Sequence, residues 1–327
     1  MWNSVRGVSI LLAVLLLVAL AWTPAWAQGE GSTPRYVIYY NSDASPPEAL
    51  IGTPYTHVIL SFVTVAPGET DDGRVSLVVP GKIAPALAVI GRLQAEGKRV
   101  LISFGGGDMW LDDYTGLVGR EDALAHAIAV FVATHGLDGV DIDFEVSAAL
   151  HGRRQPGVFD GRRFLIDLTS ALRQRLPART LISHAPQAPY LDPAWHGGPY
   201  IDVLRAVGDS IDWIMVQYYN NPDYQSPVAR RIIGLPPQPF AASYAGIVNL
   251  SWPSEKTLVG LPVYRDDASS GHLPPQRIVS EVVCPLRDRY GREFGGLTGW
   301  QFSTLTRDHR FWNDRMWGAV AGSGCEG

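Results

Sequence analysis

Three carboxylates alternate within one apolar segment of the chain. The segment DGVDIDFE, residues 138–145, places Asp141, Asp143 and Glu145 two positions apart, with apolar residues between them. Side chains two apart on a strand share a face, so the three acids should point to one side. Burying like charges this close is costly, and such a group shares protons. The pattern predicts a carboxylic acid that stays protonated near neutral pH and acts as a general acid.

Two structural alternatives explain the segment less well. A calcium loop of EF-hand type starting at Asp141 would need Gly at its sixth position and Glu at its twelfth, where Val146 and Gly152 stand. A solvated edge strand would not need apolar partners, and the segment contains neither Lys nor Arg. We therefore interpret the acids as catalytic.

Eight strand-like runs recur along the chain, several of them followed by amphipathic helix candidates. The runs are 36–40, 57–63, 99–105, 139–145, 180–186, 213–219, 257–263 and 297–303, and the helix candidates are 84–96, 122–135 and 162–176. Continuous β-rich runs separated by helices favour parallel strands, and eight such units predict an α/β fold with a single (β/α)8 TIM barrel. An open doubly wound sheet is the alternative, but no GxGxxG motif opens a helix.

The predicted barrel fixes where the three acids should lie. Their face points into the interior, with Glu145 nearest the C-terminal mouth, where barrel enzymes keep their chemistry. The stretch 220–239, rich in Pro, Asn and Arg, follows a strand and should be a loop on the same functional face.

Composition limits the class of partner. The 327 residues are 46% hydrophobic and 18% charged, which is typical of a globular protein with a substantial core. The net charge of −5, without a basic run, argues against nucleic acid as the main partner.

The first residues resemble a targeting segment. A basic start at 1–6, an apolar run at 8–22 and the small-x-small sequence Ala25-Trp26-Ala27 predict a secretory signal peptide over residues 1–27. We expect a mature domain over 28–327 that is secreted and has no membrane contact after cleavage. An uncleaved membrane anchor is the alternative.

Two cysteines, Cys284 and Cys325, permit one disulfide in an oxidising compartment, which would tie the C-terminal tail to a late element. Two free buried thiols are the alternative. The eight histidines form no ligand pattern, and His184 reads as a buried residue rather than a ligand. We predict neither a metal nor a cofactor.

Four motifs together resemble glycoside hydrolase family 18, the family of many chitinases. DGVDIDFE is similar to its DGxDxDxE signature, LISFGGG to its SxGG motif at 103–106, MVQYYNN to its sixth-strand motif, and GLTGW supplies Trp300 in the last strand. The motifs occur in the family's order over nearly the whole mature chain. The stretches APQAPY (185–190) and VQYYNNP (216–222) are most similar to the compact, hevamine-like members.

This resemblance implies a substrate-assisted mechanism with retention. Glu145 would protonate the glycosidic oxygen while the substrate's own 2-acetamido oxygen attacks the anomeric carbon. Asp143 would orient the acetamido N–H, Asp141 would exchange a proton or hydrogen bond with Asp143, and Tyr219 would donate its hydroxyl to the acetamido group.

Further residues are expected to bind substrate. Gln217 shares a face with Tyr219 and should enter the barrel mouth, whereas Tyr218 should point away. Trp300 would form an apolar floor for the sugar, with a core tryptophan as the alternative. Tyr39 and Phe62, at the ends of the first and second strands, are further candidates for lining the site, with core packing as the alternative. Gln187 is expected to reach the groove after the fifth strand, Gly105 to allow close backbone approach near the acids, and Asn220 to contact substrate. Asn220 stands where many family members have Asp, which changes the charge around Asp143.

The interval 264–296 has space only for a loop and a helix, so the α+β insertion module of larger family members should be missing. The groove would then be shallow, open at both ends and suited to endo-cleavage. The resemblance implies a monomeric, secreted endo-chitinase acting on β-1,4-linked N-acetylglucosamine polymers. The alternatives are an endo-β-N-acetylglucosaminidase on N-glycans, a peptidoglycan-cleaving relative, or a non-catalytic carbohydrate-binding relative.

Overall fold

The computed structural model describes residues 34–42, 44–66, 74–151, 157–221, 223–224, 229–234 and 240–325. The predicted signal peptide over 1–27 lies outside the described residues, as does much of the predicted 220–239 loop.

Eight parallel strands in this part of the chain form a closed barrel. They are β1 (Arg35–Tyr40), β2 (His57–Val65), β4 (Arg99–Gly105), β5 (Gly139–Asp143), β6 (Leu181–His184), β7 (Trp213–Gln217), β8 (Thr257–Pro262) and β9 (Gly296–Trp300). The sheet closes because β1 pairs with both β9 and β2, and the two-residue β3 (Leu77–Val78) adds antiparallel to β2. The prediction of a single (β/α)8 barrel is confirmed.

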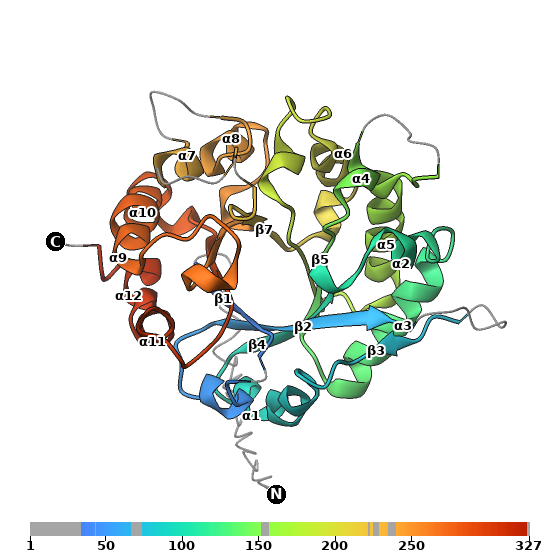
Figure 1. Cartoon of the computed structure of the whole chain (residues 1–327), viewed down its shortest axis with the longest axis horizontal. Helices are drawn as coiled ribbons and strands as arrows, with labels where there is room; N and C mark the ends of the chain where they lie inside the picture. The colour runs from blue at the N-terminus through green and yellow to red at the C-terminus, as the bar shows by residue number, and fades with distance from the viewer. Residues whose placement is uncertain are drawn as a thin grey trace, which may run out of the picture. The chain divides into compact units, whose positions relative to one another are not determined.

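The helices lie around the outside of the strands (Figure 1). They are α1 (Ile90–Ala95), α2 (Leu111–Thr115), α3 (Glu121–His135), α4 (Ser147–Leu150), α5 (Gly161–Arg175), α6 (Pro199–Val207), α7 (Ala229–Ile233), α8 (Tyr244–Asn249), α9 (Pro275–Ile278), α10 (Cys284–Tyr290), α11 (Arg307–Asp314) and α12 (Met316–Ala321). The helices expected at 122–135 and 162–176 are α3 and α5. The first part of the helix expected at 84–96 is a 3-10 helix over Ala84–Val89, and only Ile90–Ala95 is α-helical.

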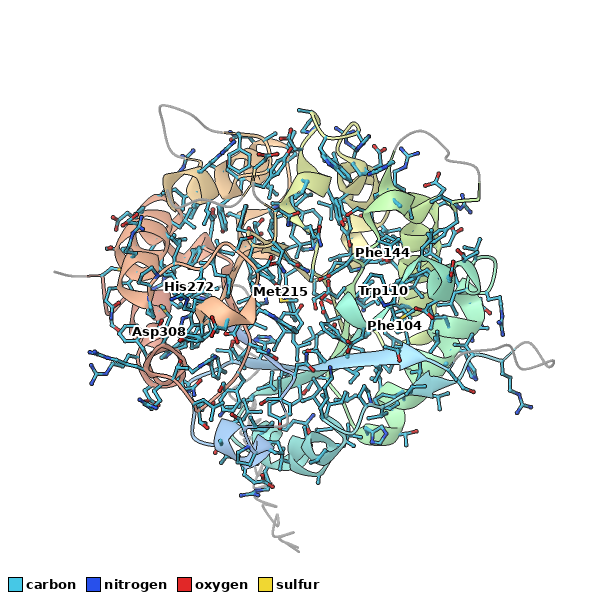
Figure 2. All side chains as sticks on the ribbon, in the orientation of Figure 1. Phe104, Trp110, Phe144, Met215, His272 and Asp308 are labelled. Carbon is cyan, nitrogen blue, oxygen red and sulfur yellow. A yellow bond between two sulfur atoms is a disulfide. The ribbon has the colours of Figure 1, made fainter. Side chains whose placement is uncertain are left out.

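Side chains on the strands divide into two apolar layers. Outward residues of β5 and its end, such as Ile142 and Phe144, pack with the helices. The inward residues form a separate cluster made of Val37, Tyr39, Ile59, Phe62, Leu101, Ala185, Trp213, Met215 and Leu258. Met215 lies near the middle of the barrel, whereas Phe104 and Phe144 lie nearer the helices (Figure 2). The alternation predicted from the sequence therefore holds.

Several strands end earlier than their sequence runs predict. The runs 139–145 and 213–219 continue past β5 and β7, which stop at Asp143 and Gln217. Apolar character continues because Phe144 and Tyr218 remain buried, although the ladder has ended. Glu145 and Tyr219 therefore lie just beyond the strands, at the mouth.

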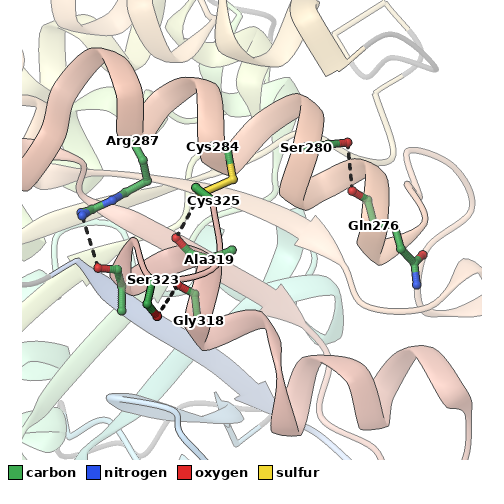
Figure 3. The surroundings of a disulfide bond; sticks show 9 residues. Gln276, Ser280, Cys284, Arg287, Gly318, Ala319, Ser323 and Cys325 are labelled. Carbon is green, nitrogen blue, oxygen red and sulfur yellow. Dashed lines mark hydrogen bonds between the residues drawn. A yellow bond between two sulfur atoms is a disulfide. The ribbon is translucent and has the colours of Figure 1, made fainter. Parts of the chain in front are cut away.

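The interval between β8 and β9 holds short helical segments and no strand, which confirms the missing insertion module. Cys284 of α10 and Cys325 form a disulfide that joins the tail to this interval (Figure 3). Closing a loop of this length, with a sequence separation of 41, stabilises the fold by about 4 kcal/mol. Within the described residues, no helix combines the length and apolar character needed to cross a membrane.

Candidate active site

Asp141 lies at the bottom of the acid row and is fully buried. Its Oδ2 accepts hydrogen bonds from Tyr39 Oη (2.9 Å) and Ser103 Oγ (2.7 Å), and its Oδ1 accepts one from Ser183 Oγ (2.8 Å). Strand register creates this arrangement, since Ser103 on β4 and Ser183 on β6 are the direct partners of Asp141. Burial raises the pKa of Asp141 to about 6, although the three hydrogen bonds oppose the rise.

Gln217 connects the two outer acids. Its Nε2 donates to Asp143 Oδ1 at 2.8 Å and lies 3.2 Å from Glu145 Oε1 and 3.0 Å from the Ala185 carbonyl. An amide group has only two hydrogens for these three acceptors. The side chain thus holds the acids from β7, two strands away in the barrel, and is itself buried.

The proton distribution in this pair follows from burial and repulsion. Burial raises the pKa of Asp143 well above its usual range, and the charges of Glu145 and Asp141 raise it further. Burial also raises the pKa of Glu145, while hydrogen bonds from Gln217 and Asp143 lower it. The two carboxyl groups therefore titrate as a coupled pair, and burial favours the protonated form of each.

Two glycines let the backbone approach the acids closely. Gly105 has a φ of 110°, and a Cβ there would lie 2.2 Å from the Asp143 carbonyl oxygen. At Gly106, a Cβ would collide with the ring of Phe62. Only glycine satisfies both the space and the positive φ at these two positions.

An aromatic group faces the acids across the barrel. The Trp300 ring stacks on Phe62 with centroids 5.5 Å apart, and Tyr39 meets Trp300 edge-on at 5.6 Å. Trp300 is only partly buried, and its Nε1 donates to the Asp267 carbonyl at 2.8 Å. Tyr39 and Phe62 are buried in the inner cluster, so they pack beneath the site while Tyr39 also reaches Asp141.

Tyr219 follows β7 and retains 7% of its exposure. Burial raises its pKa well above the usual range, and the charges of Asp143 and Glu145 raise it further, so the hydroxyl keeps its proton. Tyr218 points outward, as predicted from alternation, and its hydroxyl donates to the Ala242 carbonyl at 2.8 Å.

The side chain of Asn220 bonds to a neighbouring loop, and the backbone of Gln187 pairs with the strand that carries Gln217. Asn220 is exposed, and its Oδ1 accepts from the backbone N–H (2.9 Å) and hydroxyl (2.8 Å) of Ser269. It thus fastens a neighbouring loop, because its left-handed backbone (φ 58°) turns the side chain toward that loop. Gln187 is half-buried, and its backbone forms an isolated parallel bridge with Gln217.

Some residues that contact the acids were not predicted from the sequence. Ser183 is inward-facing at the level of Asp141, a position that alternation alone could have identified. Tyr114 and Tyr190 donate at 3.5 Å to the backbone carbonyls of Asp143 and Glu145, and both come from other segments with no local signal. His184 is buried beside Tyr200 Oη (2.7 Å), and burial lowers its pKa to about 3, so it is neutral.

A parallel barrel whose mouth holds buried acids of raised pKa defines a class of barrel enzyme that works by acid–base chemistry. The family model for glycosyl hydrolases family 18 matches residues 35–309, and the chain belongs to this family.

Relatives agree with this assignment. The chain is 28% identical over 224 residues to a chitinase of Enterococcus faecalis, covering 64% of this chain and 61% of that protein. It is 28% identical over 242 residues to an acidic endochitinase of Arabidopsis thaliana, covering 68% and 65%. These matches span less than two thirds of either relative. A crystal structure of a GH18 chitinase from Pseudoalteromonas aurantia is 35% identical, with a TM-score of 0.74, covering 88% of this chain and 99% of that one.

Proposed function

We propose that this chain is a secreted endo-chitinase that hydrolyses β-1,4-linked N-acetylglucosamine polymers with retention, using the substrate's acetamido group as nucleophile. The observation that carries the proposal is the row of Asp141, Asp143 and Glu145, whose pKa values are all raised by burial. Family membership and the relatives named as chitinases support it.

Glu145 is the outermost acid and is only partly buried, so it can meet a bound sugar chain. It donates a proton to the glycosidic oxygen as the bond from that oxygen to the anomeric carbon breaks. The acetamido carbonyl oxygen bonds to the same carbon and forms an oxazolinium ring. Water then attacks this carbon, returns a proton to Glu145 and reopens the ring, which restores the configuration.

Asp143 and Tyr219 act on the acetamido group. Asp143 accepts the hydrogen bond of its N–H and stabilises the positive charge that develops in the ring. Tyr219, whose hydroxyl keeps its proton, donates to the acetamido oxygen. A preorganised donor of this kind contributes about 3 kcal/mol to the transition state. Asp141 supports Asp143 from below through its three hydroxyl partners and its charge.

From an exposed tryptophan we infer that the substrate extends beyond the cleaved bond. Trp110 is 73% exposed and lies three residues beyond Gly107, where a Cβ would be 3.9 Å from Glu145 Oε2. Its backbone N–H donates to Asp113 Oδ2 at 2.7 Å, which holds the main chain at the start of α2. An indole presented to solvent beside the acid suits stacking on a sugar ring beyond the cleaved bond.

The localisation rests on two features. Residues 1–27 have the pattern of a secretory signal peptide, and a disulfide joins Cys284 to Cys325. Structural disulfides form and persist in oxidising compartments. We propose that the mature chain, residues 28–327, acts outside the cytoplasm as a monomer without a cofactor.

The test compares hydrolysis of chitin oligomers, a glycoprotein and peptidoglycan by the wild type and Glu145→Gln. We expect cleavage of chitin oligomers by the wild type and loss of nearly all rate in the variant, which still binds them. Preferred cleavage of the glycoprotein or of peptidoglycan would show that chitin is not the preferred substrate. Equal rates in the wild type and Glu145→Gln would contradict the assignment of Glu145 as the general acid. Efficient cleavage of oligomers that lack the N-acetyl group on the sugar at the cleaved bond would contradict the proposal that the acetamido group is the nucleophile.

A further inference from the structure

The indole of Trp300 is held by a loop rather than by its own strand. Its N–H donates to the carbonyl of Asp267, at the end of a 3-10 turn over Arg265–Asp267 that follows β8. The Asp267 carboxylate accepts the Tyr264 backbone N–H at 2.7 Å and closes this turn. The direction of the Asp267 carbonyl, and with it the orientation of the indole, therefore depends on the conformation of this turn.

His309, on α11, holds the carboxylate of the turn. Its Nε2 lies 3.1 Å from Asp267 Oδ2, and the two side chains are only 4% and 11% exposed. Its Nδ1 lies 2.7 Å from Thr306 Oγ1, which also accepts the His309 backbone N–H at 3.3 Å. The threonine hydrogen is then free to bond Nδ1, which leaves the imidazole hydrogen on Nε2, facing Asp267.

The same loop also contacts the Tyr219 side of the site. Gly271, with φ of 95°, packs so closely that a Cβ there would lie 2.7 Å from the Tyr219 Cα. A second contact with α11 joins His272 Nε2 to Asp308 Oδ2 at 3.5 Å, and the two lie on the side of the barrel away from Trp110 (Figure 2). The segment 264–272 thus touches both Trp300 and Tyr219.

We propose that His309 is a positioning residue for the sugar-binding floor: through the Asp267 carboxylate it fixes the carbonyl that orients the Trp300 indole. The catalytic part of this inference rests on the proposed function, because it assigns Trp300 to the substrate. The structural part, that His309 fixes the Trp300 indole through Asp267, does not depend on the substrate. The two parts are therefore tested by separate measurements.

The first measurement is hydrogen exchange of the Trp300 indole N–H, identified by NMR from its absence in Trp300→Phe. We expect protection in the wild type and exchange on the order of tenfold faster in His309→Leu, because the acceptor carbonyl is no longer held. His309→Gln keeps an amide donor near the Nε2 position and should restore most of the protection. Unchanged exchange in His309→Leu would overturn the proposal, whatever the substrate proves to be.

The second measurement is a double-mutant cycle on kcat/KM for chitin oligomers. We expect His309→Leu to lower kcat/KM on the order of tenfold, with recovery in His309→Gln, since small misplacements cost this much. In the Trp300→Phe background, which has no indole N–H, the same change should cost less than about twofold.

The matched control is Asp308→Asn, next to His309 on α11. It removes the negative charge that faces His272 but leaves the Asp267 carboxylate bonded, so its effect should be independent of Trp300→Phe. Equal losses from His309→Leu in both backgrounds would show a general structural role and sink the proposal. A wild type inactive on chitin oligomers would defeat the proposed function, and the exchange measurement would still decide the role of His309.

Discussion

The two sides of the barrel mouth hold their functional groups by different means. On the β4–β5–β6 side, Asp141 is bonded by hydroxyls from directly paired strand positions. On the β7–β8–β9 side, Tyr219 and Trp300 lie at or past strand ends and are held by the 264–272 loop. The acid side is therefore fixed by strand register, whereas the aromatic side depends on a loop attached to α11. We expect the first to carry the proton chemistry and the second to carry the fit to the sugar.

The largest effect should come from the outermost acid. Glu145→Gln removes the proton donor but leaves Trp300 and its loop untouched, so kcat should fall by about 10²–10⁴-fold with little change in oligomer affinity. Single-turnover rates and calorimetric binding measure the two quantities separately. Loss of binding comparable to the loss of rate would mean that the two sides are not separable.

The next effect is on the pH dependence of stability. Folded Asp141 has a pKa of about 6, above its unfolded value of about 4, so the folded state binds more protons between these values. The unfolding free energy from this group therefore falls as pH rises from about 4 to about 6, by about 3 kcal/mol in total. Asp141→Asn, whose amide stays neutral and keeps one acceptor for the surrounding hydroxyls, should flatten this part of the curve. Urea unfolding at several pH values compares the two proteins, and parallel curves would contradict the assignment.

A third change addresses the aromatic side alone. Gly271→Ala places a methyl group against the Tyr219 backbone and forces alanine into a positive φ, at a cost of about 1–2 kcal/mol. We expect kcat to fall by about tenfold through displacement of Tyr219. The pH profile of the acids should keep its shape, because no contact of Asp143 is changed; a shifted acid limb would show that the loop also controls the acids.

The smallest effect should be at the exposed rim. Trp110→Ala removes a stacking surface but no contact with the acids, so KM for long oligomers should rise by about fivefold, from a loss of about 1 kcal/mol. Short oligomers that do not reach the indole serve as the internal control. An equal rise for both lengths would argue against a platform beyond the cleaved bond.

The amino-acid sequence determined the barrel and the acid row, because both depend on short-range periodicity. Alternation within 138–145 separates acids from apolar residues, and strand and helix periods repeat often enough to predict eight units. It also identified the pair Gln217 and Tyr219 by their shared face. Strand ends were less predictable, since the apolar pattern continues through Phe144 and Tyr218 after the ladder stops.

Tertiary structure decided which distant groups meet. Nothing near Asp141 in the chain predicts Tyr39 as its partner, 102 residues away, because only closure of the barrel brings β1 near β5. The placement of Asn220 against Ser269, rather than toward the acids, depends on its own left-handed backbone and on a loop 49 residues later. Likewise, His309 reaches the Trp300 support only because α11 packs against the loop after β8. Local patterns specify faces, and long-range packing specifies neighbours.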